Sequence, residues 1–135
     1  MKLTMVQPDG LSQPVGLYSQ VCRVECQEYA FVAGQVAVAS DGNLVGEGDF
    51  SAQMRQVFRN LVVSAEAVGA SMRNVVKMTT YLVRAQDIEK FYGVREELFR
   101  EYFPSSSYPP NTLLVIDRLV REEFLIEVEA VIGVR

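Results

Sequence analysis

The sequence contains no histidine and only two cysteines, and these absences narrow the chemistry open to the chain. Without histidine there is no Ser-His-Asp or Cys-His nucleophile pair and no metal site with imidazole ligands. Cys22 and Cys26 fall in a predicted strand, where four residues at about 3.3 Å each separate them by roughly 13 Å, beyond disulfide reach. Two cysteines without other soft ligands also make a poor zinc site. We therefore expect reduced thiols, no metal, and chemistry based on carboxylate, tyrosine and arginine side chains.

The sequence also has no run of basic residues and no long apolar run. The formal net charge is -4 and the pI is near 4.9. Affinity for phosphate groups comes mainly from clustered lysine and arginine, so nucleic acid is not an expected partner. No window reaches about 18 uninterrupted apolar residues, and residues 1–4 do not open a signal peptide. We expect a cytoplasmic protein that does not enter a membrane.

The composition is that of a globular protein able to bury a hydrophobic core. Hydrophobic residues make up 49% of the chain and charged residues 22%, and the length of 135 residues fits one domain. Glycine and proline separate the periodic segments at regular intervals, and no linker, repeat or low-complexity tract interrupts them. The sequence predicts a single domain over residues 1–135.

The first half of the chain predicts two strands and a helix. Residues 18–26 and 29–38 are rich in β-branched and aromatic residues, and the short polar link between them predicts an opening hairpin. From Ser51 the apolar residues recur every 3.6 positions, which predicts an amphipathic helix. Asp49 or Ser51 would cap this helix, and Gly69 would end it.

The second half predicts three strands and a further helix. The strand at residues 74–83 is apolar on both faces and belongs in the middle of a sheet. A helix is expected from Asp87, as its N-cap, to Tyr102, followed by strands at 112–117 and 124–133. The order ββαβαββ predicts an α+β fold with both helices on one face of a sheet. Because the other face has no helix to cover it, we expect a homo-oligomer.

Two glutamates interrupt the last apolar strand. Strand side chains alternate between faces, so Glu127 and Glu129 point the same way. A buried, unpaired carboxylate is costly, so each must reach water, pair with a cation, take up a proton or face a cleft between subunits. Arg95 starts from the apolar stripe of the second helix and is a candidate partner.

Four segments of the chain form an ordered set: Gly16-Leu17-Tyr18-Ser19-Gln20, Val32-Ala33-Gly34-Gln35-Val36, the run from Asn74 to Val83, and Ile126-Glu127-Val128-Glu129-Ala130. Together and in this order they resemble the RidA/YjgF family of reactive-intermediate deaminases, also named endoribonuclease L-PSP. The resemblance covers nearly the whole chain, from Val15 to Val134. It implies a chorismate-mutase-like α+β fold and a homotrimer in which three sheets form a central barrel, with ligand clefts between subunits.

The resemblance implies that an imine or enamine is hydrolysed to a carbonyl compound and ammonia without a cofactor. Tyr18 matches the family tyrosine that closes the cleft, and Glu127 matches the glutamate that orients water. The positions of the family's carboxylate-clamping arginine and of its neighbouring cysteine hold Asn111 and Leu113. Asparagine can form hydrogen bonds but cannot supply the charge of a guanidinium group. Tyr18 as a plain packing aromatic remains the alternative.

Other residues would line the same cleft. The family serine position holds Ala33, which precedes Gly34 on the second strand. Arg95 aligns with a polar position that faces the cleft in family members, so it is a candidate for ligand anchoring together with Asn111. The alternative for Arg95 is a structural ion pair with a carboxylate such as Glu127 or Glu129. Thr112, beside Asn111, would either bind ligand or cap the proline-rich turn.

Three functions follow from these observations. The first is a homotrimer that binds a small imine, enamine or carbonyl metabolite between subunits and hydrolyses it, with Glu127 directing water. The second is a noncatalytic small-molecule-binding or regulatory trimer. This alternative is favoured if Arg95 and Glu127 neutralise each other's charge. The third is an endoribonuclease, which ranks last because an acidic chain without histidine offers little for RNA binding or acid–base cleavage.

Overall fold

The computed structural model describes residues 1–135, which form six strands and two α-helices. The elements are β1 (Lys2–Val6), β2 (Val21–Glu25), β3 (Glu28–Gln35), α1 (Phe50–Ala67), β4 (Val75–Leu82), α2 (Ile88–Tyr102), β5 (Asn111–Val115) and β6 (Ile126–Val134). Short 3-10 turns at Met72–Asn74 and Ala85–Asp87 lead into β4 and α2.

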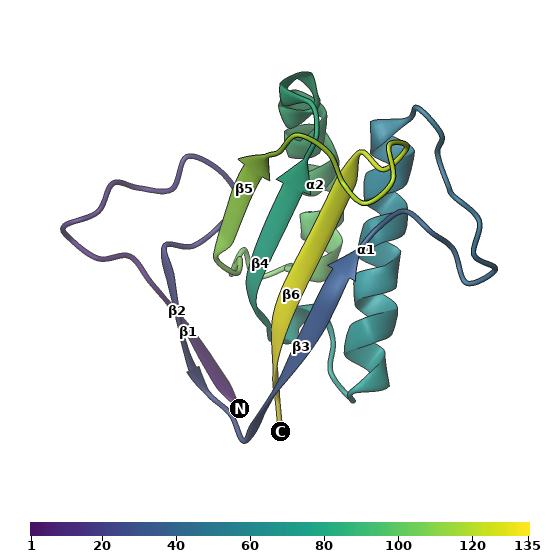
Figure 1. Ribbon diagram of the computed structural model, residues 1–135. Helices are drawn as coiled ribbons and strands as arrows, with labels where there is room; N and C mark the ends of the chain where they lie inside the picture. Colours follow the sequence, from purple (N-terminus) through teal and green to yellow (C-terminus); the bar gives the residue numbers. More distant parts are fainter.

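Four of the strands form one sheet in the order β3-β6-β4-β5. The β3/β6 and β6/β4 pairs are antiparallel, and β4 and β5 are parallel. Both α-helices lie behind this sheet and leave its front uncovered (Figure 1). The predicted α+β fold with two helices on one face is therefore confirmed.

The opening hairpin expected from the sequence is wrong. The second strand of the chain, β2, pairs antiparallel with β1, whereas β3 leaves this ribbon and pairs with the last strand, β6. The sequence analysis did not predict β1, so the chain has one strand more than the ββαβαββ order. The physical reason is that β2 finds its hydrogen-bonding partner in the first residues of the chain, which leaves β3 free to join the sheet.

Alternation along the central strands decides which side chains form the core. On β6, Ile126, Val128, Ala130 and Ile132 face the helices and are buried. Residues of α1 and α2 cover them, and most of the fully buried large side chains come from these helices. At about 25 cal/mol per Å² of apolar surface, burial of each such side chain contributes roughly 1.5–3 kcal/mol relative to exposure.

The two helices begin differently although an aspartate precedes both. The Asp49 carboxylate accepts a hydrogen bond from the backbone N–H of Ala52 at 3.1 Å and caps α1 as predicted. Asp87 precedes α2, but its buried carboxylate makes no capping bond and instead accepts from Arg84 at 2.8 and 3.2 Å. Asp87 therefore occupies the predicted N-cap position but gives no side-chain cap, because the neighbouring guanidinium takes both carboxylate oxygens.

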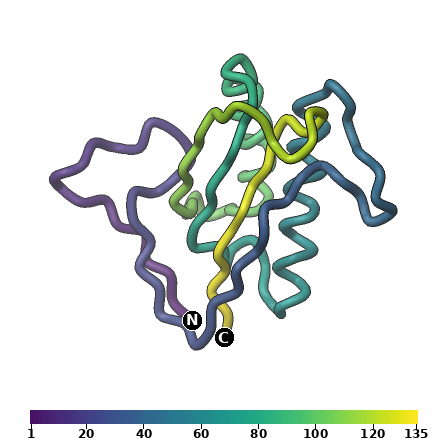
Figure 2. Tube along the Cα trace, viewed as in Figure 1, coloured from purple at the N-terminus to yellow at the C-terminus, as the bar shows by residue number.

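The chain termini lie close together at one end of the molecule (Figure 2). Cys22 and Cys26, on and just after β2, are both free thiols. Neither helix is long and apolar enough to cross a membrane.

Candidate functional site

Glu127 lies on the open face of the sheet, beside a glycine that makes room for it. It stands opposite Tyr81 of β4 in the antiparallel register, so both side chains leave the same face. A Cβ atom added to Gly34 would lie only 2.6 Å from the carboxyl carbon of Glu127. Gly34 therefore gives the carboxyl group a place at the end of β3, where the β3/β6 register is irregular.

The two glutamates of β6 differ in their partners. Glu129 accepts a hydrogen bond from the Tyr81 hydroxyl at 2.8 Å, and this bond raises the pKa of Tyr81. Glu127 makes no hydrogen bond and no ion pair within the chain. Burial, and in second place the charge of Glu129, raise the pKa of Glu127. Glu127 is thus a half-buried carboxyl group with a raised pKa and no partner in its own chain.

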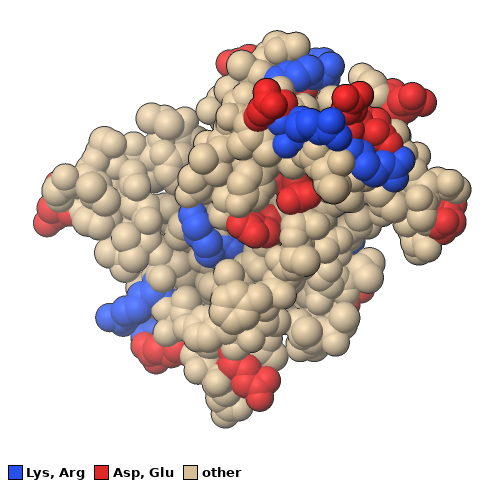
Figure 3. All heavy atoms as spheres, in the orientation of Figure 1, with Lys and Arg blue, Asp and Glu red and all other residues tan.

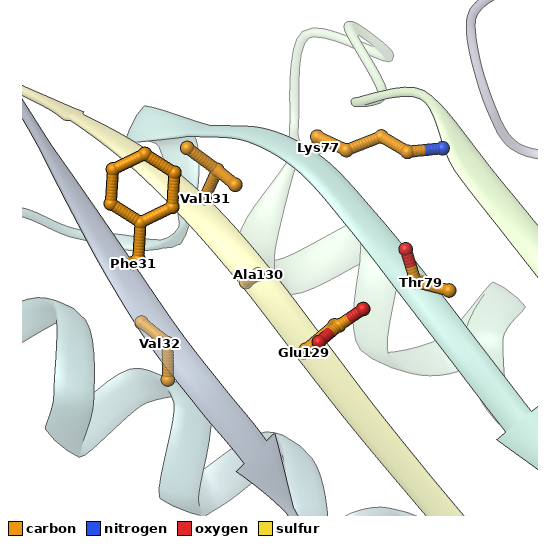
Figure 4. Close-up of a pocket in the computed structure, with 7 residues that line it drawn as sticks. All are labelled: Phe31, Val32, Lys77, Thr79, Glu129, Ala130 and Val131. Carbon is orange, nitrogen blue, oxygen red and sulfur yellow. The ribbon is translucent and has the colours of Figure 1, made fainter.

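A hollow of about 230 Å³ opens on the same face, further along the strands (Figure 4). Its lining comes from three neighbouring strands: Phe31, Val32, Lys77, Thr79, Glu129, Ala130 and Val131. The Lys77 ammonium group donates to the Thr112 hydroxyl at 2.7 Å rather than pairing with Glu129, and burial lowers the pKa of Lys77. Because Glu127 does not line this hollow, we do not take the hollow as the reaction site.

Arg95 lies in a different place, on the side of the sheet covered by the helices. Its side chain is only 4% exposed, and the guanidinium carbon lies 5.0 Å and 5.2 Å from the ring centres of Phe91 and Tyr92. A Cβ atom on Gly16 would lie 2.6 Å from Nη2. The 7–20 loop therefore closes over the guanidinium group.

No acceptor satisfies Arg95. It makes no hydrogen bond and belongs to none of the seven ion pairs, and its Nε is buried without a partner. Burial lowers the pKa of Arg95, and the nearby hydroxyls of Tyr92 and Tyr18 partly oppose this shift. The ion pair with Glu127 or Glu129 that the sequence left open is not formed within the chain.

Tyr18 lies in the 7–20 loop near Arg95. Its hydroxyl oxygen accepts a long hydrogen bond of 3.4 Å from the backbone N–H of Val15. The side chain is partly exposed and does not belong to the hydrophobic core.

The three candidates on β5 divide between the two faces of the sheet. The Asn111 carbonyl oxygen accepts from the buried Thr80 hydroxyl at 2.8 Å, and Leu113 packs against the core. Thr112, between them, faces the open side and holds Lys77. On the opposite edge of the sheet, Ala33 of β3 is exposed.

The predicted site residues thus form two groups within one chain. Glu127, Gly34, Ala33 and Thr112 are on or beside the open face, whereas Arg95, Tyr18, Asn111 and Leu113 are on the helix side or in the loop next to it. The sequence analysis missed Lys77, Thr79 and Tyr81, which share the open face with the glutamates. The period-2 alternation within residues 74–83 could have indicated them.

Comparison with known proteins assigns the family. Residues 10–134 match the family model described as Endoribonuclease L-PSP. The chain belongs to the RidA/YjgF family. The match includes both α-helices and every strand except β1. The resemblance noted in the sequence is therefore confirmed over residues 10–134.

Individual Rid relatives extend this result. A RutC family protein of Pyrococcus horikoshii is 34% identical over 119 residues, which cover 88% of this chain and 88% of the relative. The 2-iminobutanoate/2-iminopropanoate deaminase of Dermatophagoides farinae is 29% identical over 114 residues, or 80% and 88% of the two chains. The crystal structure of YyfB from Yersinia pestis, a Rid protein of unknown function, superposes with a TM-score of 0.88 at 27% identity and covers 99% of this chain and 100% of its own.

Proposed function

We propose that this Rid family protein is a homotrimer that binds a small imine, enamine or carbonyl metabolite between subunits and hydrolyses the imine to a carbonyl compound and ammonia. The observation that carries the proposal is Glu127, a half-buried carboxyl group with a raised pKa and no partner in its own chain. A pKa closer to neutrality suits a group that must both accept and return a proton. The deaminase from Dermatophagoides farinae supports the reaction class.

The reaction balances with water as the only co-reactant. The water oxygen bonds to the imine carbon while one of its protons passes to Glu127, and the imine nitrogen takes a proton from solvent. Glu127 then returns its proton to the nitrogen of the carbinolamine, ammonia leaves, and the hydroxyl proton passes to solvent as the carbon–oxygen double bond forms. No electrons are exchanged with an outside acceptor, so the proposal needs no cofactor.

The proposed assembly rests on the uncovered face of the sheet. Phe31 is 80% exposed there, and Tyr29 and Leu114 on the same face are also exposed. Figure 3 shows this face as mostly uncharged, with a few charged side chains near its middle. Apolar surface of this kind favours coverage by further copies of the chain.

Other site residues take positioning roles in the proposal. Ala33 and Gly34 border Glu127, Tyr18 closes the cleft from the 7–20 loop, and Asn111, Thr112 and Leu113 line it from β5. The side-chain carbonyl oxygen of Asn111 already accepts a hydrogen bond from Thr80, so the amide N–H groups of Asn111 remain to donate to the ligand.

Ammonia release from freshly generated imines tests the reaction. We expect Glu127→Gln to lower kcat by about 100-fold or more, because general acid–base catalysis contributes about 10²–10⁴. Glu122→Gln is the matched control, since the Glu122 side chain is 84% exposed. An unchanged kcat in Glu127→Gln would remove Glu127 from the mechanism.

The same assay separates the alternatives. If the wild type does not exceed the uncatalysed rate with any imine, the noncatalytic binding trimer replaces the proposal. This alternative is favoured by the neutral Asn111, which the family resemblance aligns with the clamping arginine.

A further inference from the structure

Arg95 is a buried cation whose five N–H donors all lack an acceptor within the chain. On its own helix, Glu96 pairs with Arg100 at 2.8 Å and Glu97 with Arg55 at 2.5 Å, and neither Glu89 nor Glu101 forms an ion pair with Arg95. Asp87, before the helix, is held by Arg84. The guanidinium group therefore has no internal carboxylate to neutralise it.

The surroundings of Arg95 compensate for burial only in part. The rings of Phe91 and Tyr92 attract the positive charge through their faces, but a ring face does not satisfy the in-plane N–H donors. Burying a charged group without hydrogen-bonding partners is costly. A guanidinium fixed in this way is prepared to receive an anion.

Gly16 lets the backbone of the 7–20 loop lie against Nη2. Any larger residue would bring a Cβ atom to 2.6 Å from Nη2 and 3.7 Å from Cζ. The backbone of Gly16 does not have a positive φ, so space rather than conformation explains the glycine. The 7–20 loop thus packs directly against the guanidinium group, with no side chain between them.

We propose that Arg95, between Phe91, Tyr92 and Gly16, is the binding site for the carboxylate group of the ligand. The planar fork of two N–H donors matches a carboxylate with two parallel hydrogen bonds. A flat monoanion fits beside two aromatic rings better than a tetrahedral dianion such as phosphate. The inference extends the proposed function, on which it rests for the identity of the ligand as an imino or oxo acid.

The two faces of the sheet add a geometric condition. Arg95 lies on the helix side and Glu127 on the open side, so the strands of one chain separate them. A small ligand that contacts both groups must lie where two copies of the chain meet. One copy would supply the carboxylate anchor and the next would supply the acid–base group.

Calorimetric titration with stable probes tests the anchor. Sodium 2-oxobutanoate carries the carboxylate, 2-butanone is its neutral counterpart, and inorganic phosphate is the competing anion. We expect the wild type to bind 2-oxobutanoate about 10–100-fold more tightly than 2-butanone, as for hydrogen bonds to a charged group. Arg95→Gln should lose this preference, and Arg95→Lys should recover only part of it because it lacks the planar fork.

Gly16→Ala provides a second variant that does not remove the charge. The added methyl group must displace the end of the Arg95 side chain, so 2-oxobutanoate binding should weaken while the fold is kept. Gly10→Ala in the same loop is its matched control, because a Cβ there meets nothing within 4 Å. Arg100→Gln, exposed on the same helix, is the control for Arg95→Gln.

Several results would overturn the anchor. One is equal affinity of the wild type and Arg95→Gln for 2-oxobutanoate. Another is equal affinity of the wild type for 2-oxobutanoate and 2-butanone. A third is a wild type that binds phosphate more tightly than 2-oxobutanoate. Loss of the oligomer in Arg95→Gln, with no 2-oxobutanoate binding by the wild type, would instead assign the guanidinium to a contact between subunits.

The outcomes separate the anchor from the reaction. Carboxylate binding that depends on Arg95, without any ammonia release, would keep the anchor and end the hydrolysis proposal. Ammonia release from imines with and without a carboxylate at equal rates, unaffected by Arg95→Gln, would keep hydrolysis and end the anchor.

Discussion

At the scale of single residues, the two glutamates of β6 show how position decides chemistry. They leave the same face of one strand, yet Glu129 is held by the Tyr81 hydroxyl and Glu127 is not. Alternation along the strand was enough to predict that they share a face. Their different partners depend on Tyr81 and Gly34, which come from other strands and could not be assigned from the spacing of the glutamates.

Arg95 shows the limit of sequence analysis more clearly. The helical stripe predicted that its side chain starts from the apolar face, and it is indeed buried. The sequence could not tell whether a carboxylate meets it, because its neighbours include the distant Gly16 and Tyr18 of the 7–20 loop. Such a contact depends on how the loop folds over α2.

The raised pKa of Glu127 predicts a pH-dependent effect on stability. The ionised form is less favourable in the folded chain than in the unfolded chain, where the glutamate pKa is about 4.3. Below that pKa both states are protonated and Glu127 has no effect. As the pH rises from there to the raised folded pKa the destabilisation grows, and above the folded pKa it is complete.

We therefore expect Glu127→Gln to melt at a higher temperature than the wild type at pH 7 and at nearly the same temperature at pH 4. Thermal unfolding of both proteins at fixed concentration across this range is the measurement. Glu122→Gln, which changes an exposed side chain, should show no such trend. A gain in stability that is the same at pH 4 and pH 7 would contradict a raised pKa.

At the scale of elements, the helices and the central strands were predictable and the pairing of the first strands was not. The apolar residues that recur every 3.6 positions after Ser51, and the glycine at position 69, predicted both ends of α1 to within a few residues. Strand pairing depends on which backbone edges meet, and local composition carries little information about it. For this reason the predicted hairpin of residues 18–38 gave way to the β1–β2 and β3–β6 pairs.

A buried glutamine joins α1 to the segment that leads into β6. Gln53 is fully buried, and its amide nitrogen donates to the carbonyl oxygens of Gly46 at 3.0 Å and Glu123 at 2.8 Å. Its carbonyl oxygen accepts from the backbone N–H of Leu125 at 2.9 Å. This side chain fixes the start of the strand that carries Glu127.

We expect Gln53→Leu to lower the free energy of unfolding by roughly 2–4 kcal/mol, because the buried N–H of Leu125 and the half-buried carbonyl of Glu123 would lose their partner. Gln56→Leu, on the same helix, breaks only the 2.9 Å bond to Asn60 and should cost about 1 kcal/mol or less. Urea denaturation of both variants at one protein concentration measures the difference. Equal losses would show that the Gln53 bonds do not hold this segment.

At the scale of the whole molecule, the sheet has one face covered by helices and one face without cover. The prediction that the second face packs against other copies follows from this imbalance and from exposed aromatic residues such as Phe31. The proposed site follows from the same arrangement, since Glu127 and Arg95 lie on opposite sides of one sheet. A complete site then requires two subunits.

Activity of mixed trimers tests this central claim most directly. Glu127→Gln and Arg95→Gln chains, carrying different affinity tags, would be produced together and the mixed trimers isolated through both tags. If one subunit supplies Glu127 and its neighbour supplies Arg95, every mixed trimer contains one intact site of three. Ammonia release should then recover to about one third of the wild-type rate, although each variant alone is inactive. Mixed trimers as inactive as the two parent variants would contradict a site built from Glu127 and Arg95 of different subunits.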